Sequence, residues 1–238
     1  MNTQLPHIDL APCPKGYTRD LDKAVSPSET IARVRNNLLQ SGLDILARTR
    51  RVDVGRLGIP VFLSECGADA RRLMPVRKQM GKGSSAEQAE ASALMELMER
   101  FAFFSFWQRR PHMISATWTE AEARFGKDLL PLESMCLSVH DNLAPEKARR
   151  VLDLISWQFY PATRLSDEKT VWLPLDWFKL LGEFNGTSAG NSAEESLLQG
   201  LCELVERHVC SRVDRLRPSL ASIDPASCTR DPVLADLL

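Results

Sequence analysis

An eighteen-residue segment that occurs twice constrains the fold of this chain more than any other feature. GSSAEQAEASALMELMER runs from Gly83 to Arg100, and GNSAEESLLQGLCELVER runs from Gly190 to Arg207, 107 positions later. Nine of the eighteen aligned positions are identical. Each copy has a glycine, a capping residue, a helical stretch, and two glutamates three positions apart followed by an arginine. The repeat predicts two halves built on one plan, with the function where the two copies meet.

Composition excludes several classes of protein. With 238 residues, 44% of them hydrophobic, the chain can bury a full core. Its net charge of -1 does not favour a nucleic acid or an anionic membrane as partner. No apolar run is long enough to span a bilayer, and the proline-rich start lacks the apolar region of a signal peptide. Six scattered cysteines without a Cys-x-x-Cys pair are typical of reduced core residues rather than of a disulfide framework, so we expect a cytoplasmic protein.

Local patterns in the first half predict an α+β fold. Ser26, Pro27 and Glu29 form a helix start, and the apolar spacing that follows predicts a helix over about 27–40 that Gly42 ends. Ser84 and Glu87 have capping-box spacing before the first repeat helix. The phenylalanine-rich run FAFFSFW at its end is typical of core. The remaining elements expected here are strands at 43–49 and 58–66 and the repeat helix at about 85–107.

The second half repeats the order of strands, Gly-rich loop and helix. We expect a connection over about 108–156, in which Pro145 opens a helix, and then a hairpin of strands at 157–165 and 169–178. A short helix closes the chain. The organisation predicted from these patterns is a first repeat at about 27–107, the connection at 108–156 and a second repeat at about 157–215.

The glutamates of the first copy suit a divalent cation. Glu96 and Glu99 project to one side of a helix, with Ser92 one turn earlier on nearly the same side. Apolar neighbours indicate that this face is partly buried, and two carboxylates that share such a site need a cation such as Mg²⁺. For a single copy the alternative is an exposed acidic face paired with Arg100.

The second copy favours the metal interpretation. Glu203, Glu206 and Arg207 reproduce the pattern, and Gln199 and Glu195 extend it backward at four-residue steps. Four glutamates from two related helices are able to converge on one or two Mg²⁺ ions, with the glutamine amide and the arginines directed at a nucleotide. Chance duplication of a solvated face explains the pattern less well.

The segments before the two helices suit phosphate. Gly81-Lys82-Gly83 and residues 185–191 carry few bulky side chains, so backbone N–H groups and a helix N-terminus are able to approach an anion, with Lys82 as counter-charge. No Walker-type loop, G-x-G-x-x-G fingerprint or zinc-ligand spacing is present. The sequence therefore favours a nucleotide with Mg²⁺ but identifies no catalytic residue.

Three spaced signatures resemble those of the YcaO family, ATP-dependent enzymes that activate peptide-backbone amides. The family's S-x-x-x-E-x-x-E-R matches the first copy, its S-x6-E-x3-Q matches the loop and start of the second helix, and its E-x3-R follows. The matching residues are Ser92, Glu96, Glu99 and Arg100, then Ser188, Glu195 and Gln199, then Glu203 and Arg207. Lys23 and Thr30 occupy the places of a lysine and a small hydroxyl residue that family members carry near the nucleotide.

The resemblance implies a fold and a set of roles. The fold is the family's α+β nucleotide-binding architecture with an internal pseudo-repeat. It implies that Glu96, Glu99, Glu203 and Glu206 hold Mg²⁺ or support its ligands. ATP contacts are expected from Lys23, Thr30, Lys82, Ser92, Arg100, Ser188, Glu195, Gln199 and Arg207.

The resemblance also implies an activity and partners. Family members phosphorylate an amide oxygen of a peptide or protein substrate and form azolines, thioamides or amidines. A TfuA-like or peptide-recognition partner and a homodimer are expected, with FAFFSFW and LPLDWF as candidate interfaces. Family domains run well past this length, so we expect a partial domain. The alternative is a non-catalytic nucleotide-binding or interaction module.

Overall fold

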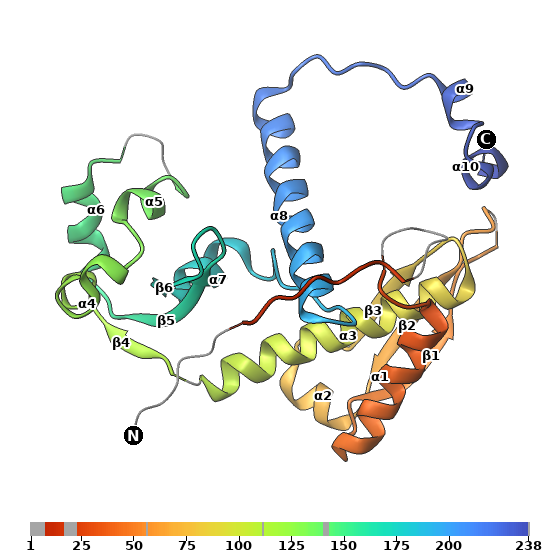
Figure 1. Cartoon of the computed structure of the whole chain (residues 1–238), viewed down its shortest axis with the longest axis horizontal. Helices are drawn as coiled ribbons and strands as arrows, with labels where there is room; N and C mark the ends of the chain where they lie inside the picture. The colour runs from red at the N-terminus through yellow and green to blue at the C-terminus, as the bar shows by residue number, and fades with distance from the viewer. Residues whose placement is uncertain (1–7, 17–22, 56, 111, 140–142, 238) are drawn as a thin grey trace. The chain divides into compact units, whose positions relative to one another are not determined.

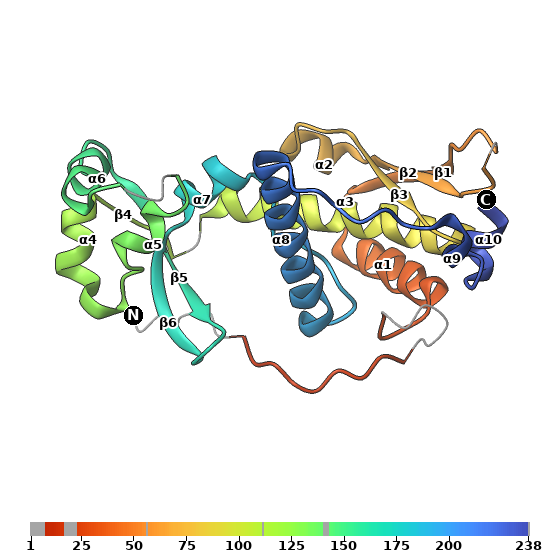
Figure 2. The same ribbon diagram turned by 90° about the horizontal axis from the view of Figure 1, so that it is seen from above.

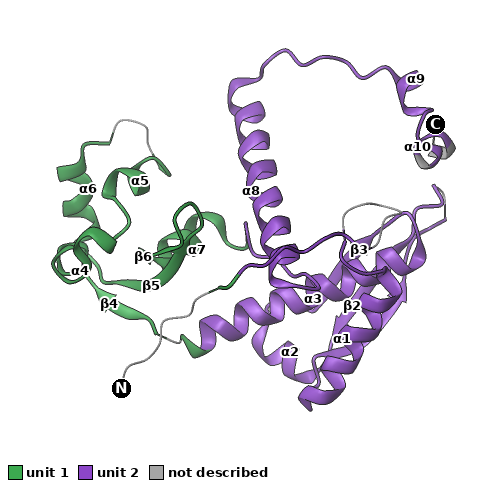
Figure 3. Cartoon of the chain, viewed as in Figure 1, with its two compact units in different colours: residues 1–9, 109–184 green, residues 10–108, 185–238 purple. Residues whose placement is uncertain are grey.

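A computed structural model describes residues 8–16, 23–55, 57–110, 112–139 and 143–237 (Figure 1). The chain divides into two compact units (Figure 3). The smaller unit holds residues 1–9 and 109–184, and the larger unit holds residues 10–108 and 185–238. Each unit combines helices with a three-stranded antiparallel sheet, which is the α+β class that the sequence predicts. The division into two repeats and a connection stays a prediction.

The larger unit packs helices on one face of its sheet. Its strands lie in the order β1-β2-β3, and Figures 1 and 2 show α1 and α3 together on the same face. Its elements are α1 (Pro27–Ser41), β1 (Leu46–Arg51), β2 (Val61–Cys66), α2 (Ala68–Leu73), β3 (Lys78–Lys82), α3 (Ala86–Arg109), α8 (Ala193–Leu216), α9 (Pro225–Cys228) and α10 (Pro232–Leu237). Helix α10 confirms the short helix expected at the end.

Local signals place α1 as predicted. The Ser26 side chain accepts a hydrogen bond from the Glu29 N–H at 3.2 Å, and Pro27 occupies the first turn. Gly42 ends the helix with φ of 68°, a left-handed conformation that glycine adopts without strain. Thr30, Val34 and Leu38 are buried, at a spacing of four residues. Because α1 presents one continuous stripe to the core, its place follows from its own sequence.

Two elements between β2 and α3 escape the sequence patterns. Residues 71–82 show no clear period, yet they contain the end of α2 and all of β3. The expected strand at 43–49 begins at Leu46 instead, because the Asp44 carboxylate accepts from the Ala68 N–H at 2.8 Å and so caps α2. The expected Ser84–Glu87 capping box is also wrong, since Ser85 Oγ accepts from the Gln88 N–H at 3.2 Å.

The core of the larger unit joins α1, α2, β2 and α3. Leu94 and Leu97 of α3 are fully buried in it. Phe101 and Phe104, from the phenylalanine-rich run, pack against it, so this part of the run is core as expected. The cluster consists of Val34, Leu38, Ile45, Cys66, Ala70, Met74, Leu94 and Leu97.

The smaller unit has its own aromatic core around Trp118 and Phe159. The Thr117–Glu120 capping box opens α4, and α6 begins at Pro145 as predicted. The expected hairpin is present, but its second strand ends at Pro174, and LDWF begins a helix instead. The elements are β4 (Ile114–Ala116), α4 (Trp118–Phe125), a 3₁₀ turn (Gly126–Asp128), α5 (Leu132–Cys136), α6 (Pro145–Leu152), β5 (Trp157–Arg164), β6 (Lys169–Pro174) and α7 (Leu175–Gly182).

Helix α8 carries the second copy of the repeated segment. The Ser192 side chain caps it by accepting from the Glu195 N–H at 3.2 Å. Gly200 is its buried residue, and the neighbouring loop approaches so closely that a Cβ at Gly200 would lie 2.7 Å from the Gly186 carbonyl oxygen. Within the ranges described above, no helix combines the length and apolar character that crossing a bilayer requires. The six cysteines are free thiols, as expected, but Cys13, Cys202 and Cys210 are exposed, so the expectation that they are core residues is wrong for these three.

Candidate active site

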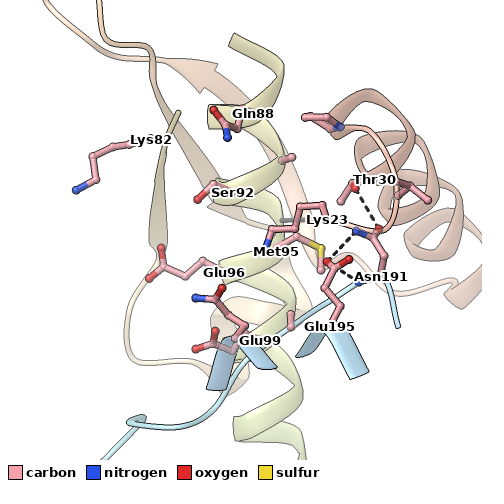
Figure 4. A pocket seen from close by; sticks show the side chains of 15 residues that line it. Lys23, Thr30, Lys82, Gln88, Ser92, Met95, Glu96, Glu99, Asn191 and Glu195 are labelled. Atoms are coloured by element: carbon pink, nitrogen blue, oxygen red, sulfur yellow. Dashed lines mark hydrogen bonds between the residues drawn. The ribbon is translucent and has the colours of Figure 1, made fainter. Parts of the chain in front are cut away.

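A cavity of about 290 Å³ lies in the larger unit (Figure 4). One wall is the polar side of α3, another is the end of β3, and the segment before α1 and the start of α8 close it. It is lined by Lys23, Val25, Pro27, Thr30, Lys82, Gln88, Ala91, Ser92, Met95, Glu96, Glu99, Ala189, Asn191, Glu195 and Gln199. Eight of the thirteen residues predicted from the sequence line this cavity: Lys23, Thr30, Lys82, Ser92, Glu96, Glu99, Glu195 and Gln199.

Helix α3 supplies the cavity wall because its two sides differ. Ser92, Glu96 and Glu99 follow at steps of four and three residues and face the cavity. The small residues Ala89 and Ala93 are fully buried and let the backbone of β3 lie directly on the helix. A Cβ at Gly81 would lie 2.2 Å from both the Ala89 carbonyl oxygen and the Ala93 nitrogen. Gly81 is thus required for the packing that brings β3 and α3 together.

The carboxylates of α3 form an acidic centre in this wall. Arg100 lies with Nη1 3.3 Å from Glu99 Oε1 and Nη2 3.9 Å from Glu96 Oε1. Thr187 Oγ1 donates to Glu99 Oε1 at 3.2 Å. Burial raises the pKa of Glu99, Arg100 and the Thr187 hydroxyl oppose that rise, and the negative charges of Glu203 and Glu96 add to it. A centre of this kind favours a bound cation.

The loop before α8 is tied to α1 by a hydrogen-bond network. Glu195 Oε1 accepts from the Asn191 N–H at 3.1 Å and from Asn191 Nδ2 at 3.0 Å. Glu195 Oε2 accepts from the Ala24 N–H at 3.0 Å, and Thr30 Oγ1 donates to Asn191 Oδ1 at 3.0 Å. Figure 4 shows these side chains meeting at one end of the cavity. Glu195 and Thr30 therefore hold the walls together as well as lining them.

Asn191 is a site residue that the sequence patterns did not single out. It takes the second position of the repeated segment, where the first copy has Ser84, and this difference between the copies was the available signal. Its role depends on Thr30, which lies 161 positions away.

Replacement of Asn191 should destabilise the contact between α1 and the loop before α8. Asn191→Ala removes the side-chain hydrogen bonds to Thr30 Oγ1 and Glu195 Oε1, although Glu195 keeps its bonds to two backbone N–H groups. We therefore expect the free energy of unfolding to fall by about 1–3 kcal/mol. Asn191→Asp should cost more, because a second carboxylate would lie where Nδ2 is now 3.0 Å from Glu195. Urea unfolding checks both, with Asn185→Ala in the same loop as control. An Asn191→Asp variant as stable as the original chain would contradict this assignment.

The other five predicted residues lie outside the lining of the cavity. Arg100 pairs with the α3 glutamates, and Ser188 Oγ bonds Ser196 Oγ at 3.0 Å, which fastens the loop to α8. Glu203 accepts from the Gly186 N–H at 3.1 Å. Farther along α8, Glu206 and Arg207 are 3.7 Å apart, with side chains 60% and 52% exposed.

The carboxylates at the cavity suit a cation that is also bound by a phosphate ligand. In the part of the chain that the structure describes, no three Asp, Glu, His or Cys side chains converge closely enough to hold a metal by themselves. Glu96 and Glu99 line the cavity together, and Glu203 lies near enough to raise the pKa of Glu99. Mg²⁺ commonly takes one or two carboxylates and completes its shell with phosphate oxygens and water. These residues therefore suit a metal–nucleotide complex.

Comparison with known proteins identifies the family. Residues 80–238 match the sequence model of the YcaO cyclodehydratases, described as ATP- and Mg²⁺-binding. The chain belongs to the YcaO family. The match covers both copies of the repeated segment and confirms the family predicted from their signatures. ATP and Mg²⁺, the cofactors expected from the sequence, are those of the family.

Relatives are found in bacteria and archaea. An uncharacterized protein of Methanothermobacter thermautotrophicus is 28% identical over 235 residues, which cover 91% of this chain and 54% of that protein. The Escherichia coli ribosomal protein S12 methylthiotransferase accessory factor YcaO is 29% identical over 66% of this chain and 30% of its own length. An uncharacterized protein in the tfuA 3′ region of Rhizobium leguminosarum bv. trifolii is 27% identical over 92% of this chain and 51% of that protein. The chain spans about half or less of the length of these YcaO relatives.

Two solved structures share the fold. A heterocyclase in complex with substrate and cofactor aligns with a TM-score of 0.61 at 20% identity, over 84% of this chain and 30% of that one. YcaO from Methanopyrus kandleri, bound with AMPPCP and Mg²⁺, aligns with a TM-score of 0.54 at 22% identity, over 87% of this chain and 51% of that one. The α+β fold expected from the resemblance is thus confirmed.

Proposed function

We propose that this chain is the nucleotide-binding portion of a YcaO enzyme that activates backbone amides of a peptide or protein with ATP and Mg²⁺. The observation that carries the proposal is that Lys23, Lys82, Glu96 and Glu99 line the same cavity. Family membership supports the cofactors. The products that this chemistry allows are an azoline, a thioamide or an amidine.

Each segment around the cavity has a proposed task. When bound, ATP with Mg²⁺ supplies the phosphoryl group and neutralises its charge. Glu96 and Glu99, with Glu203 nearby, hold the cation. Lys23 and Lys82 attract the phosphates from two different segments, and Ser92 and Gln199 offer hydrogen bonds between them. The network of Asn191, Glu195 and Thr30 keeps the walls in place.

Residues outside the cavity lining have supporting tasks in this proposal. Arg100 orients Glu96 and Glu99 by pairing with both. Ser188 holds the loop on α8 through Ser196. Glu206 and Arg207 form an exposed pair on α8, and in this proposal they would add contacts to the metal and the nucleotide.

A nucleotide-binding module without turnover is the second candidate. It is favoured by the exposed Glu206–Arg207 pair, which lies outside the cavity lining. Mg²⁺-dependent consumption of ATP separates the two functions, because the module binds the nucleotide and releases it unchanged.

The proposed partners follow from the relatives and from exposed apolar surface. A relative encoded in a tfuA 3′ region favours a TfuA-like partner that delivers substrate or sulfur. A homodimer is proposed through the apolar runs named above; Phe178, at the end of LPLDWF, is exposed.

Removal of either lysine should weaken ATP binding. Lys23→Ala and Lys82→Ala each delete one positive charge from the cavity, and we expect each to raise the Kd for ATP by about tenfold, the loss of one charge-assisted hydrogen bond. Equilibrium binding of a fluorescent ATP analogue checks this. Lys127→Ala, an exposed lysine in the smaller unit, is the control. Unchanged affinity in both cavity variants would contradict the proposed phosphate site.

A further inference from the structure

The outer edge of β3 carries unused main-chain groups beside the cavity. Among the described strands, β3 pairs with β2 alone. The Cys66 N–H donates to the Arg77 carbonyl at 3.0 Å, which fixes the alternation of the antiparallel ladder that follows. In this register Met80 lies opposite Leu63, and these two residues form a non-hydrogen-bonded pair of the antiparallel ladder. The backbone N–H and C=O of Met80 therefore point away from β2. Lys78 and Lys82 share that orientation.

The hydrogen bond of the Met80 N–H confirms that this group points away from β2. The Met80 N–H donates to Glu96 Oε2 at 3.2 Å, so the carboxylate lies where an added strand would place a carbonyl oxygen. Glu96 also lines the nucleotide cavity, as does Lys82 at the end of the strand. A polypeptide paired with this edge would therefore pass directly beside the cavity.

The same edge has an excess of positive charge. Arg77 and Lys78 are exposed, and within the described ranges neither forms an ion pair with a carboxylate. The opposite edge differs, because Arg48 and Arg50 of β1 both pair with Glu65. Edge strands with open main-chain groups bind extended peptides by adding a strand, and the unpaired cations favour an acidic one.

We propose that the outer edge of β3 binds an extended, acidic segment of the peptide substrate as an added strand. This inference rests on the proposed function, since it assigns the substrate of the same site. Glu96 has two competing partners, the Met80 N–H in the nucleotide-free chain and the cation of the bound nucleotide. When Glu96 turns toward the cation, the Met80 N–H becomes available to the peptide. The nucleotide therefore binds first and promotes peptide docking.

The test uses a matched pair of substitutions at Met80. Met80→Pro removes the outward N–H and leaves the β2 ladder intact, since proline is tolerated at such edge positions. Met80→Val keeps the N–H and changes only the side chain. The probe is a fluorescein-labelled peptide of alternating threonine and glutamate, measured by anisotropy with Mg²⁺ and AMPPCP. The same peptide with N-methyl groups on alternate residues retains its charge but is unable to pair as a strand.

The expected result is binding of the unmethylated peptide alone, weakened about tenfold by Met80→Pro, as for one lost hydrogen bond, and little changed by Met80→Val. Glu96→Ala should bind the peptide without nucleotide and should speed hydrogen exchange at the Met80 amide. Equal binding of the methylated peptide, or equal affinity of the two Met80 variants, would overturn the inference.

Parallel titration with Mg²⁺ and AMPPCP separates this inference from the proposed function. Nucleotide binding without peptide binding overturns the β3 site alone. If the original chain binds no nucleotide and Glu96→Ala still binds the peptide, the β3 site is upheld and the proposed function is contradicted.

Discussion

Replacement of Glu96 and Glu99 together by glutamine should abolish the Mg²⁺ dependence of ATP binding while the fold stays intact. Both side chains line the cavity, and the pKa of Glu99 is raised by burial and by the charges of Glu96 and Glu203. Glutamine keeps the size of each side chain and removes its charge, so the cation loses its carboxylate ligands. We expect the affinity for Mg²⁺·ATP to fall by at least about 100-fold. The measurement is competition against a fluorescent ATP analogue at several Mg²⁺ concentrations.

The control for this variant lies on the same helix. Glu87→Gln makes the same chemical change at an exposed position of α3 outside the cavity lining, so its affinity should match that of the original chain. Glu203→Gln tests whether α8 contributes to the same cation. A double variant at Glu96 and Glu99 that still binds ATP only with Mg²⁺ would show that the cation is held elsewhere.

Substitution of Gly81 should have the largest effect on stability. A Cβ at this position would lie 2.2 Å from backbone atoms of Ala89 and Ala93, and neither backbone atom is able to turn aside as a flexible side chain does. We expect Gly81→Ala to lower the free energy of unfolding by about 3 kcal/mol, the upper part of the range for overpacked cores. For a unit of this size, that corresponds to a fall in Tm of about 6–12 °C.

Met80→Ala is the control for Gly81. Met80 precedes Gly81 in β3, but its side chain is 53% exposed, so its removal should change the unfolding free energy by no more than about 0.5 kcal/mol. Calorimetry of both variants measures the difference. A Gly81→Ala variant that unfolds at the original temperature would mean that β3 does not lie directly on α3.

Parts of the fold were predictable because their signals are local. Ser26, Pro27 and Gly42 define α1 within its own sequence, and the spacing of Ser92, Glu96 and Glu99 places them on one side of α3. By contrast, β3 and α2 depend on distant partners. Asp44 caps α2 from 24 positions away, and the strand character of residues 78–82 comes from pairing with β2 and contact with α3.

The same distinction applies to the candidate site. The repeat identified the carboxylates of α3, while the resemblance to the family added Lys23 and Thr30, which the structure brings to the same cavity. Asn191 was missed because its function is set by a contact with α1 that no local pattern reveals. Helical spacing alone also grouped Glu206 with Glu203, although the Glu206 side chain is more exposed than that of Glu203.

The central claim is that this chain holds a working site for ATP with Mg²⁺. Isothermal titration of AMPPCP into the original chain, with and without Mg²⁺, tests it most directly. The account predicts one site per chain that requires Mg²⁺ and is lost in the Glu96→Gln, Glu99→Gln variant. A folded chain that binds no AMPPCP, or binds it equally well without Mg²⁺, would contradict the account.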